Sequence, residues 1–233
     1  MTILATHAHS RYFHIGGDEV KFPCWNQSTA IRKVVSERYG NLSSASFELL
    51  QAEWTANVSA AAVTEAGKTA VLWQPTAEGP GDAAWDNALP SDALYMIWLN
   101  AASAKAYAEA GKNVIFTTPF YVAGMGANGW NHVYNAPIIP ANISAAARAR
   151  FVGAEVCMWG ESQGTSNTFM RAFQIGAGAA ESFWRAHDGS PGPGSATGLG
   201  TSDRFNRFLC HLKSIGIDAP PIMPGWCGLV SRV

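Results

Sequence analysis

Short apolar runs alternate along the chain with longer segments whose apolar residues recur at helical spacing. The runs end near residues 20, 74, 99, 118 and 159 and predict five strands. The helical pattern covers residues 29–39, 46–66, 101–110, 168–184 and 203–215. Because strands and helices alternate, the sequence predicts an α/β fold with a parallel sheet and with functional residues just after the strands.

Turn-forming residues separate these elements. Gly67 and Gly111 end the second and third helices, since glycine is common directly after the last helical residue. Residues 119–140 predict a loop that is too long for a mere connector and is therefore a candidate binding loop. Residues 190–200 are rich in glycine, proline and serine and predict a mobile surface loop. Their glycines do not follow a strand, as a nucleotide-binding fingerprint requires.

The first apolar run ends in two glycines followed by two carboxylates, Asp18 and Glu19. Neighbouring residues of a strand point to opposite sides, so these two can face one cleft only if the chain turns at Gly16 and Gly17. Two carboxyls in different environments can take different catalytic roles. A second interpretation is the start of a helix, where carboxylates are favoured. A third is a metal site with His14, which lacks a second His or Cys at ligand spacing.

The segment His14-Ile15-Gly16-Gly17-Asp18-Glu19-Val20, followed by Cys24-Trp25, resembles the signature of the family 20 glycoside hydrolases, the β-N-acetylhexosaminidases, and most closely their eukaryotic lysosomal branch. The similarity continues, in the family's order, through Leu72-Trp73-Gln74, Ile97-Trp98, Pro119-Phe120-Tyr121, Trp130 with Tyr134, residues 153–161, and Cys210 with Cys227. The resemblance implies a partial (β/α)8 barrel that contains about strands four to eight. Residues 1–233 would form the C-terminal portion of a single catalytic domain whose N-terminal strands are missing.

The resemblance also implies roles for individual residues. In this family the 2-acetamido group of the substrate is the nucleophile, so the protein supplies none. Glu19 matches the general acid and base, and Asp18 matches the carboxylate that orients the acetamide. Tyr121 matches the tyrosine that donates a hydrogen bond to the acetamide oxygen. The remaining matches bind the sugar: Trp73, Trp98 and Trp159 as indole walls, and Glu161 as a partner of remote hydroxyls.

Two positions depart from the family's pattern. Ala123 stands where an aspartate usually grips a sugar hydroxyl, and Pro75 stands where an acidic residue often follows Trp-Gln. A sheet of five barrel strands would also leave two open edges and an unfilled interior. We therefore expect these 233 residues alone to be inactive and poorly soluble. An inactive or vestigial glycan-binding fragment, or a truncated gene product, stays an alternative to the active hydrolase.

Composition narrows the class of partner. The 233 residues are 48% hydrophobic and carry a net charge of −1 without clusters of Lys or Arg, which argues against nucleic acid and anionic membrane surfaces. Apolar runs long enough to span a membrane are absent. We predict no cofactor and no metal. Nine tryptophans and six tyrosines suit sugar binding. The expected partner is an oligosaccharide or glycoconjugate that ends in N-acetylhexosamine, and the resemblance adds a dimer of the full-length protein.

The cysteines and acceptor triplets bear on localisation. By resemblance, Cys210 and Cys227 form a C-terminal disulfide, and Cys24 would pair with a cysteine upstream of this sequence. Cys157 fits a small buried hydrophobe. Residues 1–11 lack the features of a signal peptide. Four glycosylation triplets nevertheless favour a lysosomal or secreted protein, and they begin at Asn26, Asn41, Asn57 and Asn142.

Overall fold

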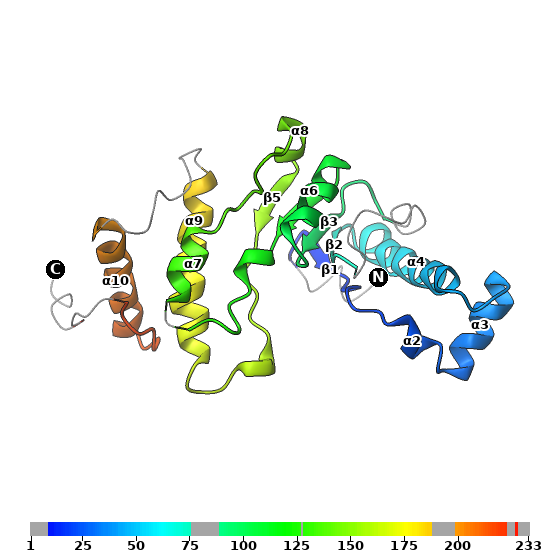
Figure 1. Cartoon of the computed structure of the whole chain (residues 1–233), viewed down its shortest axis with the longest axis horizontal. Coiled ribbons are helices and arrows are strands. Elements are labelled where there is room, and N and C mark those ends of the chain that lie inside the picture. Colours follow the sequence, from blue (N-terminus) through cyan, green and yellow to red (C-terminus); the bar gives the residue numbers. More distant parts are fainter. Residues whose placement is uncertain (1–8, 76–88, 127, 188–198, 223–226, 228–233) are drawn as a thin grey trace. The chain divides into compact units, whose positions relative to one another are not determined.

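The computed structural model describes residues 9–75, 89–126, 128–187, 199–222 and 227, and Figure 1 shows their helices and strands. The chain divides into two compact units. Unit 1 contains Met1–Ile115 and Asn142–Val152, and unit 2 contains Phe116–Ala141 and Gly153–Val233. None of the described helices combines the length and the apolar character that crossing a bilayer requires.

The described residues form a five-stranded sheet in which the strands follow one another in chain order. The strands are β1 (Tyr12–His14), β2 (Thr69–Trp73), β3 (Leu94–Ile97), β4 (Asn113–Phe116) and β5 (Phe151–Ala154). β1 pairs with β2 and β2 with β3 in parallel register, with Phe13 opposite Ala70 and Leu72 opposite Tyr95. The predicted α/β class and the number of strands are confirmed.

Two strand boundaries differ from the prediction. β1 ends at His14, well before residue 20, because Gly16 and Gly17 have φ values of 72° and 102° that cannot continue a pleated strand. The last strand is Phe151–Ala154 instead of residues 153–159. Cys157 therefore lies beyond the strand, where it forms an isolated parallel bridge with Tyr121.

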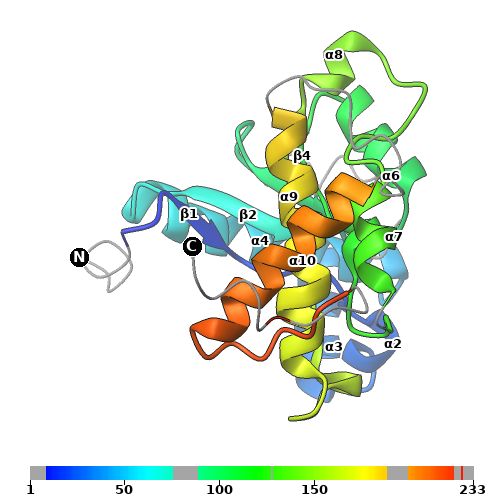
Figure 2. The ribbon, with the colours of Figure 1, turned by 90° about the vertical axis from the view of Figure 1, so that its left-hand side faces the viewer.

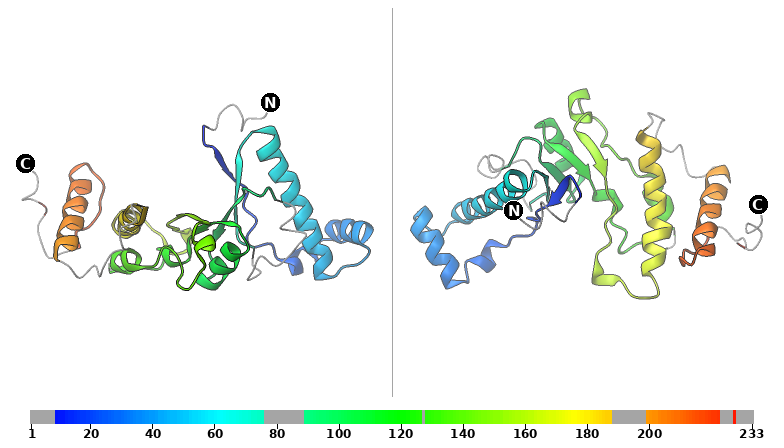
Figure 3. Two further views of the ribbon diagram at one scale, coloured as in Figure 1. Left: turned by 90° about the horizontal axis from the view of Figure 1, so that it is seen from above. Right: turned by 180° about the vertical axis from the view of Figure 1, so that it is seen from behind.

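Most helices of unit 1 start after a serine or asparagine whose side chain accepts a backbone N–H of the first turn. The helices of this unit are α2 (Phe22–Trp25), α3 (Thr29–Tyr39), α4 (Ser44–Ala60), which continues as the π-helix η1 (Ala61–Glu65), α6 (Ala101–Glu109) and α8 (Ala145–Arg148). The Ser28 hydroxyl accepts the Ile31 N–H at the start of α3, and Gly40 ends that helix at φ 81°. Helices α3 and α4 lie side by side in both views of Figure 3. The short helices α2 and α8 were not predicted.

The helices of unit 2 pack around two apolar clusters. The elements are η2 (Thr118–Phe120), α7 (Gly129–Asn135), η3 (Gly160–Ser162), the π-helix η4 (Met170–Ile175), α9 (Gly176–His187) and α10 (Leu199–Ser214). In one cluster, Trp130 and Tyr134 of α7 pack with Phe205 and Leu209 of α10. Ala177 of α9 packs against the same cluster, and Figure 2 shows α10 crossing α9.

These helices correct two sequence predictions. Residues 119–140 are not one continuous loop, because they contain part of η2 and all of α7, whose Trp130 and Tyr134 are buried. Helix α10 begins at Leu199, within the predicted surface loop. The rest of that loop, residues 190–198, lies outside the described residues. The predicted disulfide is present, and it joins Cys210 of α10 to Cys227.

Candidate functional site

A glycine turn carries the two carboxylates. After β1 the chain bends at Gly16 and Gly17, where the sequence allowed a turn, and both residues have positive φ. Two hydrogen bonds tie this turn to neighbouring elements: the Gly16 carbonyl accepts the Trp73 N–H at 3.2 Å, and the Gly17 carbonyl accepts the Gln51 side-chain amide at 3.2 Å. The turn is therefore tied both to β2 and to helix α4.

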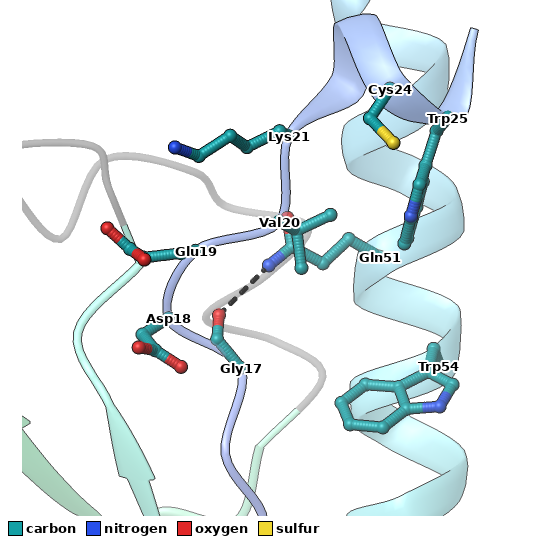
Figure 4. A pocket seen from close by; sticks show the side chains of 9 residues that line it. All are labelled: Gly17, Asp18, Glu19, Val20, Lys21, Cys24, Trp25, Gln51 and Trp54. Atoms are coloured by element: carbon teal, nitrogen blue, oxygen red, sulfur yellow. Dashed lines mark hydrogen bonds between the residues drawn. The ribbon is translucent and has the colours of Figure 1, made fainter. Parts of the chain in front are cut away.

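Asp18 and Glu19 do not cap a helix. The next helix, α2, starts at Phe22 with Lys21 as its N-cap residue, and it has no acidic residue in its first turn. Figure 4 shows both carboxylates on the side of the turn away from Trp25 and Trp54. The interpretation of the pair as a helix start is therefore wrong.

A hollow of about 690 Å³ opens beside the turn within unit 1. Its lining residues include Asp18, Glu19, Lys21, Trp25 and Trp54 (Figure 4). Glu19 is exposed, whereas Asp18 is partly buried. Sequence reasoning did not assign Trp25 or Trp54 to the site. The available signal for Trp54 was an indole on an amphipathic helix, and its side chain is 46% exposed.

The ends of the next two strands contribute tryptophans. Trp73 is the last residue of β2, and Trp98 directly follows β3. The indole N–H of Trp98 donates to the Gln74 carbonyl at 2.8 Å, which fixes its ring beside the end of β2. The carboxylates and these two indoles thus follow three adjacent parallel strands, which is the edge where α/β enzymes carry their sites.

His14 lies between the turn and β2. Its Nδ1 accepts the Gly16 N–H at 3.0 Å, and its ring lies 5.4 Å from the ring of Trp73 at an interplanar angle of 55°. Although the residue as a whole is exposed, burial of the ring lowers the pKa of His14, and the negative charge of Asp18 acts in the opposite direction. The net shift favours the neutral form of the imidazole.

Three further predicted residues lie in unit 2. Tyr121 pairs with Cys157, whose backbone exchanges hydrogen bonds of 2.9 Å with Phe120 and Val122. Trp159 lies two positions beyond Cys157 and is 42% exposed, and the exposed Glu161 lies in η3. The described chain thus holds the predicted site residues in two groups, one in each unit.

Cys157 and Glu155, two neighbouring residues of unit 2, have raised pKa values. Burial raises the pKa of the Cys157 thiol to about 12, and the charge of Glu155 adds to that shift. Burial also raises the pKa of Glu155 itself. Sequence reasoning did not single out Glu155. The thiol of Cys157 is 6% exposed and stays protonated near neutral pH, as expected for a buried hydrophobe.

Ala123 is anchored through its backbone carbonyl. The Ala123 carbonyl accepts the Ser162 hydroxyl at 3.0 Å and the Gln163 side-chain amide at 2.9 Å. This contact joins the turn after Tyr121 to η3, which carries Glu161. Across the part of the chain that the structure describes, no three His, Cys, Asp or Glu side chains gather as a metal site would require.

A comparison against known families identifies the domain. Residues 1–187 match the family model described as "Glycosyl hydrolase family 20, catalytic domain". The chain belongs to glycosyl hydrolase family 20. The resemblance expected from the His14–Val20 motif is confirmed.

Curated relatives of this family 20 chain are β-hexosaminidase subunits. The chain is 29% identical over 214 residues to β-hexosaminidase subunit B2 of Dictyostelium discoideum, covering 91% of this chain and 36% of that protein. It is 24% identical over 226 residues to the alpha subunit of Rattus norvegicus, covering 93% of this chain and 39% of that protein. The chain therefore spans less than two fifths of the length of these relatives.

Solved family 20 structures share the fold. A chitobiase of Flavobacterium johnsoniae superposes with a TM-score of 0.63 at 20% identity, covering 88% of this chain and 30% of that one. An exo-β-N-acetylglucosaminidase of Vibrio harveyi, in complex with N-acetylglucosamine, superposes with a TM-score of 0.64 at 19% identity, covering 94% of this chain and 34% of that one.

Proposed function

We propose that the protein is an exo-acting β-N-acetylhexosaminidase that removes terminal N-acetylglucosamine or N-acetylgalactosamine from glycans. One observation carries the proposal: in a family 20 chain, Asp18 and Glu19 stand on a glycine turn at the end of β1, and Trp73 and Trp98 follow the next two strands. The names of the two curated relatives described above, both β-hexosaminidase subunits, agree with it.

The proposed reaction is substrate-assisted and retaining. The carbonyl oxygen of the substrate's 2-acetamido group attacks the anomeric carbon, and the glycosidic C–O bond breaks as Glu19 protonates the departing oxygen. Asp18 accepts the acetamide N–H and stabilises the positive charge of the oxazolinium intermediate. Glu19 then removes a proton from the water that opens this intermediate.

Orientation of the acetamide is the second requirement. Tyr121 donates its hydroxyl to the acetamide oxygen and holds that oxygen in line with the anomeric carbon. Trp73, Trp98 and Trp159 wall the acetamide and the sugar ring, and Glu161 binds hydroxyls far from the scissile bond. In this proposal the five strands correspond to strands four to eight of a (β/α)8 barrel.

The proposed partner is a glycan or glycoconjugate that ends in N-acetylhexosamine, and the proposed location is the lysosome or the extracellular space. Three of the four acceptor asparagines, Asn41, Asn57 and Asn142, are exposed, which supports glycosylation along the secretory route. A dimer of the full-length protein belongs to the same proposal.

The role of Glu19 has a direct test. Glu19→Gln keeps the shape of the side chain but cannot donate a carboxyl proton, so hydrolysis of chitobiose should fall by about 10²- to 10⁴-fold. Hydrolysis of 4-nitrophenyl N-acetyl-β-glucosaminide should fall less in its first step, because nitrophenolate leaves without a proton. Glu37→Gln, on the exposed face of α3, is the matched control. Equal rates for wild type and Glu19→Gln on chitobiose would remove Glu19 from this role.

One observation favours a second candidate, a glycan-binding protein without turnover. Ala123 supplies only backbone contacts where the family has an aspartate, so a charged hydrogen bond worth about 1.5–3 kcal/mol is lost. Calorimetric titration with N-acetylglucosamine, together with an assay for turnover, separates the two candidates. Binding without turnover in wild type and in Ala123→Asp favours the second candidate, and turnover that rises in Ala123→Asp favours the hydrolase.

A further inference from the structure

The imidazole of His14 closes a compact set of contacts around the acidic turn. Its Nδ1 accepts the Gly16 N–H at 3.0 Å, and its ring packs on Trp73 with 5.4 Å between ring centroids. Trp73 in turn donates its backbone N–H to the Gly16 carbonyl at 3.2 Å. Both polar groups of Gly16 are therefore held, one by His14 and one by the residue against which His14 packs.

The first of these hydrogen bonds fixes the state of the ring. A backbone N–H can only donate, so Nδ1 must present its lone pair to Gly16, and the ring proton must lie on Nε2. A protonated imidazole carries hydrogen on both nitrogens and cannot accept this bond. The contact therefore exists only in the neutral Nε2–H tautomer.

The turn needs such a restraint. Gly16 and Gly17 are two successive glycines with positive φ, and glycine loses more conformational freedom on folding than any other residue. Without a side chain of their own, neither glycine can fix the direction in which the chain leaves β1. Asp18 and Glu19 follow immediately, so their placement depends on contacts made by neighbours of the turn.

We propose that His14 is a positioning residue, whose neutral ring holds the Gly16–Gly17 turn against Trp73 and thereby sets the direction of Asp18 and Glu19. This inference rests on the proposed hydrolase function and deepens it. Protonation of the ring releases the turn, so the working geometry of the two carboxylates belongs to the neutral state of His14.

The surroundings of the ring are consistent with this role. Asp18 is the charged group that acts on His14 from the turn, and it favours the protonated ring. Burial acts against protonation and is the larger influence, so the pKa of His14 lies below its usual 6.5. On β2, the packing partner Trp73 does not titrate. The guanidinium of Arg11, before β1, donates to the Tyr12 hydroxyl at 3.0 Å.

Two substitutions separate the hydrogen bond from the ring contact. Asn at this position can accept the N–H two residues on through its side-chain oxygen, but it has no ring. Phe keeps a ring against Trp73 but has no acceptor. The variants are compared in the full-length protein. The kcat for chitobiose should fall by about tenfold or less in His14→Asn, because only the ring contact is lost. It should fall by about 100-fold in His14→Phe, because a displaced catalytic group costs that much.

The pH profile of kcat gives a readout that packing alone would not move. In wild type, protonation of His14 should lower kcat on the acid side of the profile, at a pH below 6.5. In His14→Asn this component should be absent, because the amide does not titrate. Equal losses in the Asn and Phe variants, or an unchanged acid limb in His14→Asn, would overturn the proposal.

A spectroscopic measurement on the wild-type protein keeps the test independent of catalysis. Nitrogen-15 NMR of labelled histidine should report the neutral Nε2–H tautomer for His14, with the Gly16 amide protected from hydrogen exchange. The Nδ1–H tautomer would overturn the proposal. If the tautomer is as expected but chitobiose is not hydrolysed, the proposed function fails and the contact stands. If Glu19-dependent hydrolysis occurs and both variants match wild type, the positioning role fails and the function stands.

Discussion

Helices α7 and α9 approach each other closely at Gly178 of α9. Gly176 of the same helix has no such close contact and serves as its control. A methyl group added at Gly178 of α9 would lie 2.9 Å from the carbonyl oxygen of Trp130 and 3.5 Å from its Cα. A methyl group added at Gly176 would meet its nearest atom, of Val156, at 3.7 Å, which is ordinary contact. The perturbation is therefore a pair of variants, Gly178→Ala and Gly176→Ala.

The expected magnitudes follow from two opposing effects. Replacing a helical glycine by alanine stabilises by about 0.5–1 kcal/mol, because the unfolded chain loses freedom and the helix propensity improves. At Gly178 the added methyl forces α7 and α9 apart, since the atom it meets belongs to the backbone and cannot change rotamer. Overpacking of this kind costs about 1–3 kcal/mol.

The difference between the two variants isolates the close contact, because the propensity gain is common to both. Gly176→Ala should raise the free energy of unfolding by about 0.5–1 kcal/mol. Gly178→Ala should fall about 1–3 kcal/mol below Gly176→Ala. Urea unfolding followed by far-UV circular dichroism measures both values, provided that the slope with urea stays constant. Equal stabilisation in the two variants would refute the close approach of α7 to α9.

Three other predictions concern thiols, the disulfide and pH. A thiol reagent should modify exposed Cys24 in the native protein and Cys157 only after unfolding. Cys157 is 6% exposed, and burial raises the pKa of its thiol to about 12. Rapid modification of both thiols in the native protein would contradict this. Replacing Cys210 and Cys227 together by alanine opens a loop of 17 residues and should lower the free energy of unfolding, measured with urea, by about 3 kcal/mol, whereas Cys24→Ala should leave it unaltered. The pKa of His14 is lower in the folded state, so the unfolded state binds the proton more readily. The free energy of unfolding should therefore be unreduced above pH 6.5 and should decline below it until the folded ring also protonates. Thermal melts of His14→Asn should lack this decline.

Local signals predicted the elements that depend on neighbouring residues. Helix α3 was predicted to the residue from the spacing of its apolar residues, and the structure shows that local residues fix its ends, with Ser28 as the cap and Gly40 at φ 81°. The glycine turn before Asp18 was anticipated from a local signal too, since two adjacent glycines after an apolar run give the backbone the freedom to turn.

Elements that depend on distant partners were missed. Helix α7 contains Gly and Asn and has weak helical propensity, and it is held by the packing of Trp130 and Tyr134 against α10. β5 was placed too late, at residues 153–159, whereas pairing selects the earlier segment through the hydrogen bond from the Val114 N–H to the Arg150 carbonyl at 2.8 Å. Trp54 joins the hollow only because α4 packs beside the turn.

The π-helix η4 makes the orientation of α9 depend on the number of residues that precede it. The Gly176 N–H reaches back five positions to the Arg171 carbonyl, so this turn holds one residue more than an α-helical turn. Deleting one residue from Met170–Ile175 would restore the shorter turn and leave the residues of α9 facing as they do now. A deletion that the π turn does not absorb would instead rotate α9 by about 100° about its axis, and Gly178 would then face away from Trp130.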